Sequence, residues 1–207
     1  MRIIEKKKIL FNEWANTYDQ DVEKASGPLD GYQNSLTLAA RTIQINKDER
    51  LLDIGIGTGG FASLFISKMA DIHGIDLSPN MLEKCQEKFP NFTLKEGVFT
   101  SIDYGDQTFQ AAVSSFCFHE VERKERQKAC DEVYRILQPG GRFTLLDIMF
   151  ASKTAMKQAS LDLQNNWDPT EDYSIVGELD ALLYHSGFRQ IKWMQSARCQ
   201  WIVTAVK

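Results

Sequence analysis

The stretch "LLDIGIGTGGF", Leu51–Phe61, decides the fold of this chain. Its first four residues are apolar apart from one aspartate, which is typical of a buried strand. A run of glycines follows, and the next segment, Phe61–Met69, has apolar residues at helical spacing. The stretch therefore predicts a strand, a tight turn and a helix. Repeated units of this kind build a parallel sheet with helices on both faces.

The glycine loop between the strand and the helix fits two ligand-binding patterns. The pattern G-x-G-x-x-G, found in dinucleotide-binding enzymes, is met by Gly55, Gly57 and Gly60. The pattern D-x-G-x-G-x-G is met by Asp53, Gly55, Gly57 and Gly59. A carboxylate at Asp53 would repel a pyrophosphate and attract an ammonium group. The remaining chain is taken up by the same sheet, which leaves no second domain for a dinucleotide enzyme's substrate. The loop therefore favours a ligand with a positively charged end.

Length and composition are those of an ordinary globular protein. The 207 residues suit one domain, and 43% of them are apolar and 25% charged. With 24 basic and 28 acidic residues the net charge is −4, which argues against a general attraction to nucleic acid or anionic membranes. No apolar run approaches the roughly 20 residues of a membrane span, and the N-terminus lacks the features of a signal peptide. Four scattered cysteines indicate reduced thiols in a cytoplasmic protein.

Strand-like and helix-like segments alternate along the chain. The predicted parallel strands are Leu51–Ile54, Ile72–Asp76, Phe92–Lys95, Ala111–Phe116 and Arg142–Ile148. Ser78 and Pro79 are typical of a helix start, and Glu122–Leu137 has helical spacing up to the stop "QPGG". Near the C-terminus, Phe188–Met194 and Cys199–Val206 are joined by four residues, which forces an antiparallel pair. We expect a doubly wound α/β fold with a mainly parallel seven-stranded sheet and an antiparallel last strand.

The whole chain, residues 1–207, is interpreted as one domain with four parts. Residues 1–30 form an N-terminal helical lid, in which Met1–Glu23 is an amphipathic helix followed by the loop "KASGPLDG". Residues 31–150 form the ligand-binding half, and residues 151–173, with the loop "NNWDPTEDY", form a candidate substrate lid. Residues 174–207 form the final helix and the β-hairpin. The basic run "EKKK", Glu5–Lys8, is expected to lie on a solvated helix face.

From Leu36 to Val206 the chain resembles the class I S-adenosylmethionine-dependent methyltransferases. "LLDIGIGTGGF" is similar to the first motif of that family. "IHGIDLSPNML", residues 72–82, is similar to the second, in which an acidic residue, here Asp76, binds both ribose hydroxyls. "QPGGRFTLLD" resembles the turn before the fifth strand of the family, and the final antiparallel pair resembles its reversed seventh strand. The resemblance implies S-adenosylmethionine as cofactor, S-adenosylhomocysteine as product and transfer of a methyl group to a small molecule.

The resemblance also implies a set of cofactor-binding residues. They are Asp53, Gly55, Gly57, Gly59, Asp76, Leu77, Met81, Val98, Phe99 and Phe116. Val98 departs from the family pattern, which often has an acidic residue there to contact the adenine amino group. The backbone amide of Phe99 and apolar contact with Met81 would then hold the adenine.

Methyl transfer from a sulfonium needs little covalent help, because orientation of the reactants supplies most of the rate. His119, just past the fourth strand, is either a structural histidine beside the cofactor or a base in contact with the substrate. Tyr18 either packs the first helix onto the body or closes over the cofactor. Trp167 either lines a substrate pocket or fastens its loop to the body. Glu120 is expected to be solvated or to begin a helix, and no metal-ligand spacing is visible.

Other functions stay open at this point. A nucleic-acid or protein methyltransferase is one alternative, but "SSFCFHEV" stands after the fourth strand where a [DNS]-P-P-[YFW] motif would be expected. A non-catalytic S-adenosylmethionine-binding protein is another, and an NAD-dependent oxidoreductase is the least favoured. The predicted partner is a small-molecule substrate, with neither nucleic acid nor membrane expected.

Overall fold

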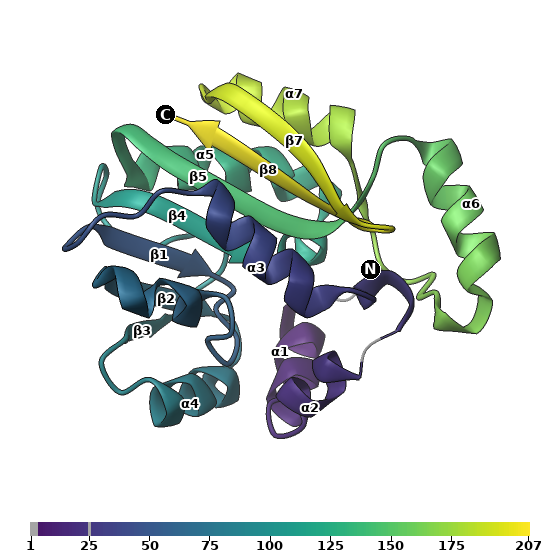
Figure 1. The fold of residues 1–207 in the computed structure, drawn as a ribbon, viewed down its shortest axis with the longest axis horizontal. Helices are drawn as coiled ribbons and strands as arrows, with labels where there is room; N and C mark the ends of the chain where they lie inside the picture. The colour runs from purple at the N-terminus through teal and green to yellow at the C-terminus, as the bar shows by residue number, and fades with distance from the viewer. Residues whose placement is uncertain (1–3, 25) are drawn as a thin grey trace.

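The computed structural model describes residues 4–24 and 26–207, and its centre is one mixed sheet. The strands are β1 (Arg50–Ile54), β2 (Asp71–Asp76), β3 (Thr93–Glu96), β4 (Phe109–Ser115), β5 (Leu137–Phe150), β6 (Ser174–Ile175), β7 (Arg189–Ala197) and β8 (Gln200–Val206). Seven of them follow the order β3-β2-β1-β4-β5-β8-β7 (Figure 1). Strands β1 to β5 pair in parallel, whereas β8 is antiparallel to both of its neighbours. The predicted fold class is confirmed.

The eighth strand, β6, was not predicted. It has two residues and pairs with Met149 and Phe150 at the end of β5. A segment of two residues carries no periodicity that a sequence pattern could detect.

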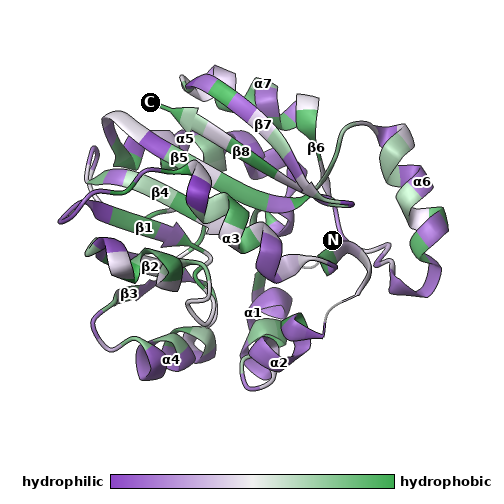
Figure 2. Ribbon diagram, in the orientation of Figure 1, coloured by the Kyte–Doolittle hydropathy of each residue, from purple (hydrophilic) through white to green (hydrophobic). Residues whose placement is uncertain are grey.

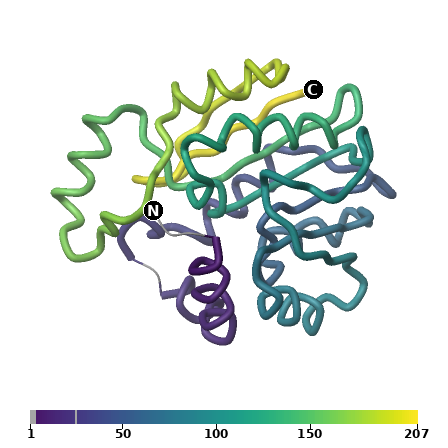
Figure 3. Tube along the Cα trace, turned by 180° about the vertical axis from the view of Figure 1, so that it is seen from behind, coloured from purple at the N-terminus to yellow at the C-terminus, as the bar shows by residue number. Residues whose placement is uncertain are grey.

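Helices cover both faces of the sheet (Figures 1 and 3). One face carries α3 (Tyr32–Thr42), α4 (Pro79–Lys88) and the 3-10 helix η2 (Ala62–Lys68), and the other carries α5 (Arg126–Ile136) and α7 (Val176–Ser186). Successive strand residues point to opposite faces. Accordingly, Leu51 packs in the cluster that contains Leu36 of α3, and Leu52 packs with Val133 of α5. Green, hydrophobic segments run along the central strands in Figure 2.

Two groups of elements lie outside these layers. The helices α1 (Ile4–Trp14) and α2 (Tyr18–Glu23) lie beside the carboxyl end of β1, and α6 (Lys153–Leu163) stands beyond the end of β5 (Figure 1). The short helices η1 (Gly27–Leu29) and η5 (Gln164–Asn166) bring the two groups together. Leu29 and Trp167 pack against the same small core cluster under α6. Within the described residues, no helix is long and apolar enough to cross a membrane.

Several predicted helices differ from the observed ones. Met1–Glu23 is two helices rather than one, and Met1–Ile3 lie outside the described residues. The segment Phe61–Met69 is a 3-10 helix, and its Met69 side chain is exposed. The helix predicted at Glu122–Leu137 begins at Arg126 after a separate turn, η4 (Arg123–Glu125), and the chain passes directly into β5. Helix α3 was missed, although its buried Leu36 and Ala39 stand at helical spacing.

The last helix is closed by a glycine that its conformation requires. Gly187 has φ of 111°, and a Cβ built there would lie 2.7 Å from the ring of Tyr134. Its N–H donates to the carbonyl of Tyr184, and the N–H of Phe188 donates to the carbonyl of Leu183. These bonds satisfy the free carbonyls at the helix end and direct the chain into β7.

We predict that Gly187→Ala lowers the stability of the fold by about 1 kcal/mol or more, because alanine is strained in the left-handed region. For a domain of this size 1 kcal/mol corresponds to a fall of about 2–4 °C in Tm, measurable by calorimetry. Gly177→Ala in the same helix is the control, since a Cβ there meets no atom within 4 Å. Equal Tm changes in the two variants would contradict this role of Gly187.

Candidate functional site

A pocket opens at the carboxyl ends of β1, β2, β3 and β4, where ligands bind in sheets of this type. Nine residues expected at the site line it: Tyr18, Gly55, Gly57, Asp76, Leu77, Met81, Val98, Phe99 and Phe116. Four further predicted residues, Asp53, Gly59, His119 and Trp167, do not line it. The predicted motifs therefore meet in one cavity, although four of the predicted residues lie outside its lining.

The glycine loop distinguishes between the two patterns of the sequence. Gly57 and Gly59 both have positive φ, of 55° and 91°. A Cβ at Gly57 would meet no atom within 4 Å, so the pocket wall is open there, whereas one at Gly59 would lie 2.8 Å from the ring of Phe89. Gly60 has neither a positive φ nor a close neighbour. Glycine is therefore not required at the third position of the dinucleotide pattern, whereas the backbone conformation of Gly57 and Gly59 favours it at these two positions of D-x-G-x-G-x-G.

Asp76 joins two walls of the pocket. Its Oδ2 accepts the N–H of Gly57 at 2.8 Å, and its Oδ1 accepts the N–H of Ser78 at 2.8 Å. The Ser78 hydroxyl in turn accepts the N–H of Met81 and caps α4, as the sequence predicted. Burial raises the pKa of Asp76 to about 6, so the group is mostly ionised at neutral pH. A carboxylate in this position is suited to accept hydrogen bonds from hydroxyl groups of a ligand.

Within the part of the chain that the structure describes, Asp53 is a buried carboxyl group without a cation beside it. The residue is 1% exposed, and among the described residues no hydrogen bond of regular geometry reaches its oxygens, although the backbone N–H of Ala62 lies close enough to oppose the rise of its pKa. Burial, together with the nearby charge of Asp76, raises the pKa of Asp53 to about 8. Asp53 therefore destabilises the protein in the absence of a compensating cation. Its contact with an ammonium group stays a prediction.

Tyr18 lines the pocket and also packs against the body. Its hydroxyl lies 3.5 Å from that of Tyr32, and the ring of Tyr32 stacks on Phe116 with centroids 4.7 Å apart. Phe116 adopts a left-handed φ of 48° where the chain leaves β4. Burial raises the pKa of Tyr18 well above its usual value, so the hydroxyl stays protonated. The packing role and the pocket role predicted for Tyr18 are thus compatible.

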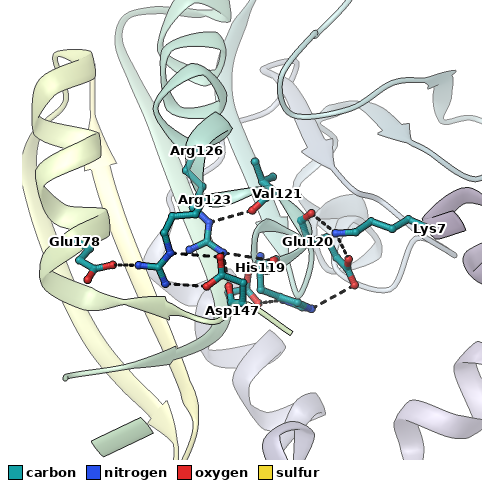
Figure 4. A network of polar contacts seen from close by, with 9 residues as sticks. Lys7, His119, Glu120, Val121, Arg123, Arg126, Asp147 and Glu178 are labelled. Atoms are coloured by element: carbon teal, nitrogen blue, oxygen red, sulfur yellow. Dashed lines mark hydrogen bonds and ion pairs between the residues drawn. The ribbon is translucent and has the colours of Figure 1, made fainter. Parts of the chain in front are cut away.

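Helix α1 adds residues to the pocket that the sequence analysis missed. Ile4, Lys7 and Phe11 all line it. Lys7 is only 6% exposed, and its Nζ lies 2.6 Å from Oε2 of Glu120 and donates to the carbonyl of Glu120 (Figure 4). The predictions that "EKKK" and Glu120 are solvated are therefore wrong for Lys7 and Glu120. The burial of Lys7 could have been predicted from its spacing. It stands three residues after Ile4 and four before Phe11, and these three residues share one face of a helix.

His119 is fastened to β5 through Asp147. Its Nδ1 lies 2.5 Å from Oδ1 of Asp147, and its backbone N–H donates to Oδ2 at 2.8 Å (Figure 4). Burial alone would lower the pKa of His119, but the carboxylate of Asp147 outweighs it and raises the pKa to about 9. The ring is therefore protonated at neutral pH. This state favours the structural interpretation of His119 over the role of a base.

A further set of polar contacts holds the loop after β4. Arg126, buried at 3% exposure, donates to the carbonyls of Val121 and Asp172. Arg123 lies 2.7 Å from Oε2 of Glu178 (Figure 4). It also lies 2.8 Å from Oδ1 of Asp172. The loop is thereby joined both to the segment before β6 and to α7.

Trp167 does not line the pocket, and one group of candidate metal ligands includes the lining residue Glu120. Trp167 packs on Phe150 and Tyr173 at centroid distances of 5.7 and 5.1 Å, which favours its role of fastening the loop. Among the described residues, one group could hold a metal ion: His119, Glu120 and Glu171, with ligand atoms within 4.8 Å of one another. The first two already pair with Asp147 and Lys7. The expected absence of a metal stays a prediction.

The chain is similar to known methyltransferases in both sequence and structure. Residues 51–141 match the family described as "Methyltransferase domain". An uncharacterized methyltransferase of Anoxybacillus flavithermus is 25% identical over 209 residues, covering 96% of each chain. A demethylmenaquinone methyltransferase of Chlorobaculum parvum is 29% identical over 155 residues, covering 73% of this chain and 64% of the relative. A putative methyltransferase of Haloferax volcanii, solved in complex with the activator Trm112, superposes with a TM-score of 0.76 at 16% identity, covering 95% and 96% of the two chains.

We predict that Asp53→Asn stabilises the protein in the absence of ligand. The unfolded chain releases the Asp53 proton near pH 4, whereas the folded chain keeps it up to about pH 8, so stability falls as the pH rises between these values. Asparagine does not titrate, so the variant lacks this fall of stability with pH. The Tm of the variant minus that of the wild type should therefore grow from pH 5 to pH 8 and then level off. Asp103→Asn, at a side chain 91% exposed, is the control. A lower Tm than wild type at pH 8 would contradict the account of Asp53.

Proposed function

The chain belongs to the class I S-adenosylmethionine-dependent methyltransferases, and from this premise we propose that it methylates a small-molecule acceptor. The observation that carries the proposal is the pocket around Asp76, whose lining includes Phe11 and Tyr18 of the N-terminal helices. The cofactor assignment fits the residues present. Asp76 offers carboxylate oxygens for ribose hydroxyls, Asp53 lacks a counter-ion, and the wall at Gly57 is open. When bound, S-adenosylmethionine supplies a methyl group already activated by a sulfonium.

The cover over the pocket supports a small acceptor. Four polar contacts join α1 and α2 to different segments of the pocket wall: Lys7 to Glu120, Lys8 to Glu96, Asn12 to Ser78 and Asp19 to Thr58. These contacts hold α1 and α2 against the pocket wall, an arrangement that favours a small acceptor over a polymer. The net charge of −4 also disfavours nucleic acid. One relative is named for a small-molecule acceptor, demethylmenaquinone. With four unpaired cysteines, a cytoplasmic location completes the proposal.

The residues of the chain act by orientation and by exclusion of water. Helices α1 and α2 place Phe11 and Tyr18 over the pocket, and Phe116 forms its wall below Tyr32. Because Asp147 keeps His119 protonated, His119 serves to hold the loop after β4 in place, and we assign no proton abstraction to it. Precise alignment of acceptor and methyl group then supplies the rate.

We predict that Asp76→Ala weakens binding of S-adenosylmethionine at least about tenfold, because a lost hydrogen bond to a charged group costs about 1.5–3 kcal/mol. Isothermal titration measures the affinity. The control is Asp71→Ala at the opposite end of β2, which should leave the affinity unchanged. NADH should not compete. An Asp76→Ala variant with wild-type affinity would rule out Asp76 as the ribose ligand.

We predict that the covering segments gain protection from hydrogen exchange when S-adenosylhomocysteine binds. Residues 4–23 and the "NNWDPTEDY" loop should exchange more slowly, because closure over the ligand stabilises their polar contacts. Helix α7, which is remote from the pocket lining, is the internal control. Protection of the glycine loop alone would show that the two segments are packing elements rather than lids.

A further inference from the structure

The ion pair of Lys7 and Glu120 lies in the pocket wall. Their side chains are 8% and 13% exposed, and both residues line the cavity. Lys6, one residue earlier in α1, is exposed. The helix is therefore not buried throughout, and the burial of Lys7 is specific to its position. Burying an ammonium group is costly unless it is bound by an anion and by hydrogen-bond acceptors. The pocket therefore contains a place that binds an ammonium group well enough to keep it out of water.

Glu120 supplies both groups of that place, a carboxylate in an ion pair and a backbone carbonyl that accepts a hydrogen bond. Its carboxylate lies 2.6 Å from the Lys7 Nζ, and its backbone carbonyl accepts a hydrogen bond from the same nitrogen (Figure 4). The residue is held in a 3-10 turn by its own N–H, which donates to the carbonyl of Cys117. On its other side the Nε2 of His119 lies 3.9 Å from Oε1, and His119 is anchored by Asp147. The acceptors therefore belong to the rigid loop after β4 and not to the covering helix.

The charges of the side chains that line the cavity point to the same chemistry. Among the described residues that line it, Lys7 is the one basic side chain, against Asp76, Glu120, Glu122 and Glu125. An anionic acceptor would meet repulsion from these carboxylates, whereas a cationic one would be attracted. The rest of the lining is largely apolar, with Phe11, Val98 and Val121 among its members. The cavity suits a molecule with an apolar body and a positively charged group.

Resting on the proposed function, we propose that Glu120 forms an ammonium-binding subsite for the methyl acceptor, which Lys7 occupies when no acceptor is bound. The acceptor class is a small molecule that carries a charged amino group. Its ammonium replaces that of Lys7 on the carboxylate and carbonyl of Glu120. Displacement of Lys7 also frees one of the polar contacts that hold α1 over the pocket, so that acceptor binding and the position of α1 are coupled.

The test uses three probes of similar size and different charge: phenethylamine, 2-phenylethanol and 3-phenylpropionate. Each is titrated into the full-length protein saturated with S-adenosylhomocysteine. We expect phenethylamine to bind at least about tenfold more tightly than either of the others, as expected from loss of a hydrogen bond to a charged group. This comparison is made on the wild-type protein and does not depend on the folding of any variant.

Three variants test whether Glu120 and Lys7 are responsible for the preference for the amine. Glu120→Gln should abolish the preference for the amine, and Lys7→Met should bind phenethylamine several-fold more tightly, because the competing ammonium is gone. Lys6→Met is the matched control on the same helix and should behave as wild type. Circular dichroism and the affinity for S-adenosylhomocysteine show that each variant is folded.

The outcomes separate the subsite from the proposed function. Failure of the wild type to bind S-adenosylhomocysteine would overturn the proposed function. Normal binding of S-adenosylhomocysteine with equal affinity for the three probes would overturn the subsite alone. The subsite would also be overturned by a preference for the amine that persists in Glu120→Gln, or by an unchanged affinity for the amine in Lys7→Met.

Discussion

The carboxylate of Asp76 is the interaction on which the arrangement of the site depends. By accepting the N–H groups of Gly57 and Ser78, it joins the loop after β1 to the start of α4 across two neighbouring strands. The covering helix α1 is attached to the same place, because the hydroxyl of Ser78 donates to Oδ1 of Asn12. One carboxylate thus shapes the floor of the pocket and supports the attachment of α1 beside it. Satisfied polar networks of this kind specify a single geometry.

The site also contains ionisable groups whose burial the fold alone does not favour. Asp53 is buried without a cation beside it in the described structure, and Lys7 is buried beside Glu120. Such groups cost stability, and proteins tend to concentrate costs of this kind at functional sites. Both are readily explained by ligands with positive charge, one at the glycine loop and one at Glu120.

Much of the fold could be predicted from the sequence because it depends on local patterns. Apolar runs ending in the glycine loop, the cap at Ser78 and the short connection before Cys199 each determine structure within a few residues. Residues of these motifs, such as Gly57 and Asp76, accordingly line the pocket. The contacts that were missed join distant segments. Lys7 meets Glu120 across 113 residues, and the protonation of His119 depends on Asp147, 28 residues away. No local pattern contains such pairs.

The measurement that tests the central claim most directly is a crystal structure of the protein with S-adenosylhomocysteine. The account predicts that the ligand lies in the pocket with its ribose hydroxyls hydrogen-bonded to Asp76, its adenine beside Val98 and Phe99, and its amino acid end at the open wall of Gly57. Binding of S-adenosylhomocysteine elsewhere on the protein, or in the pocket with its ribose away from Asp76, would contradict the account.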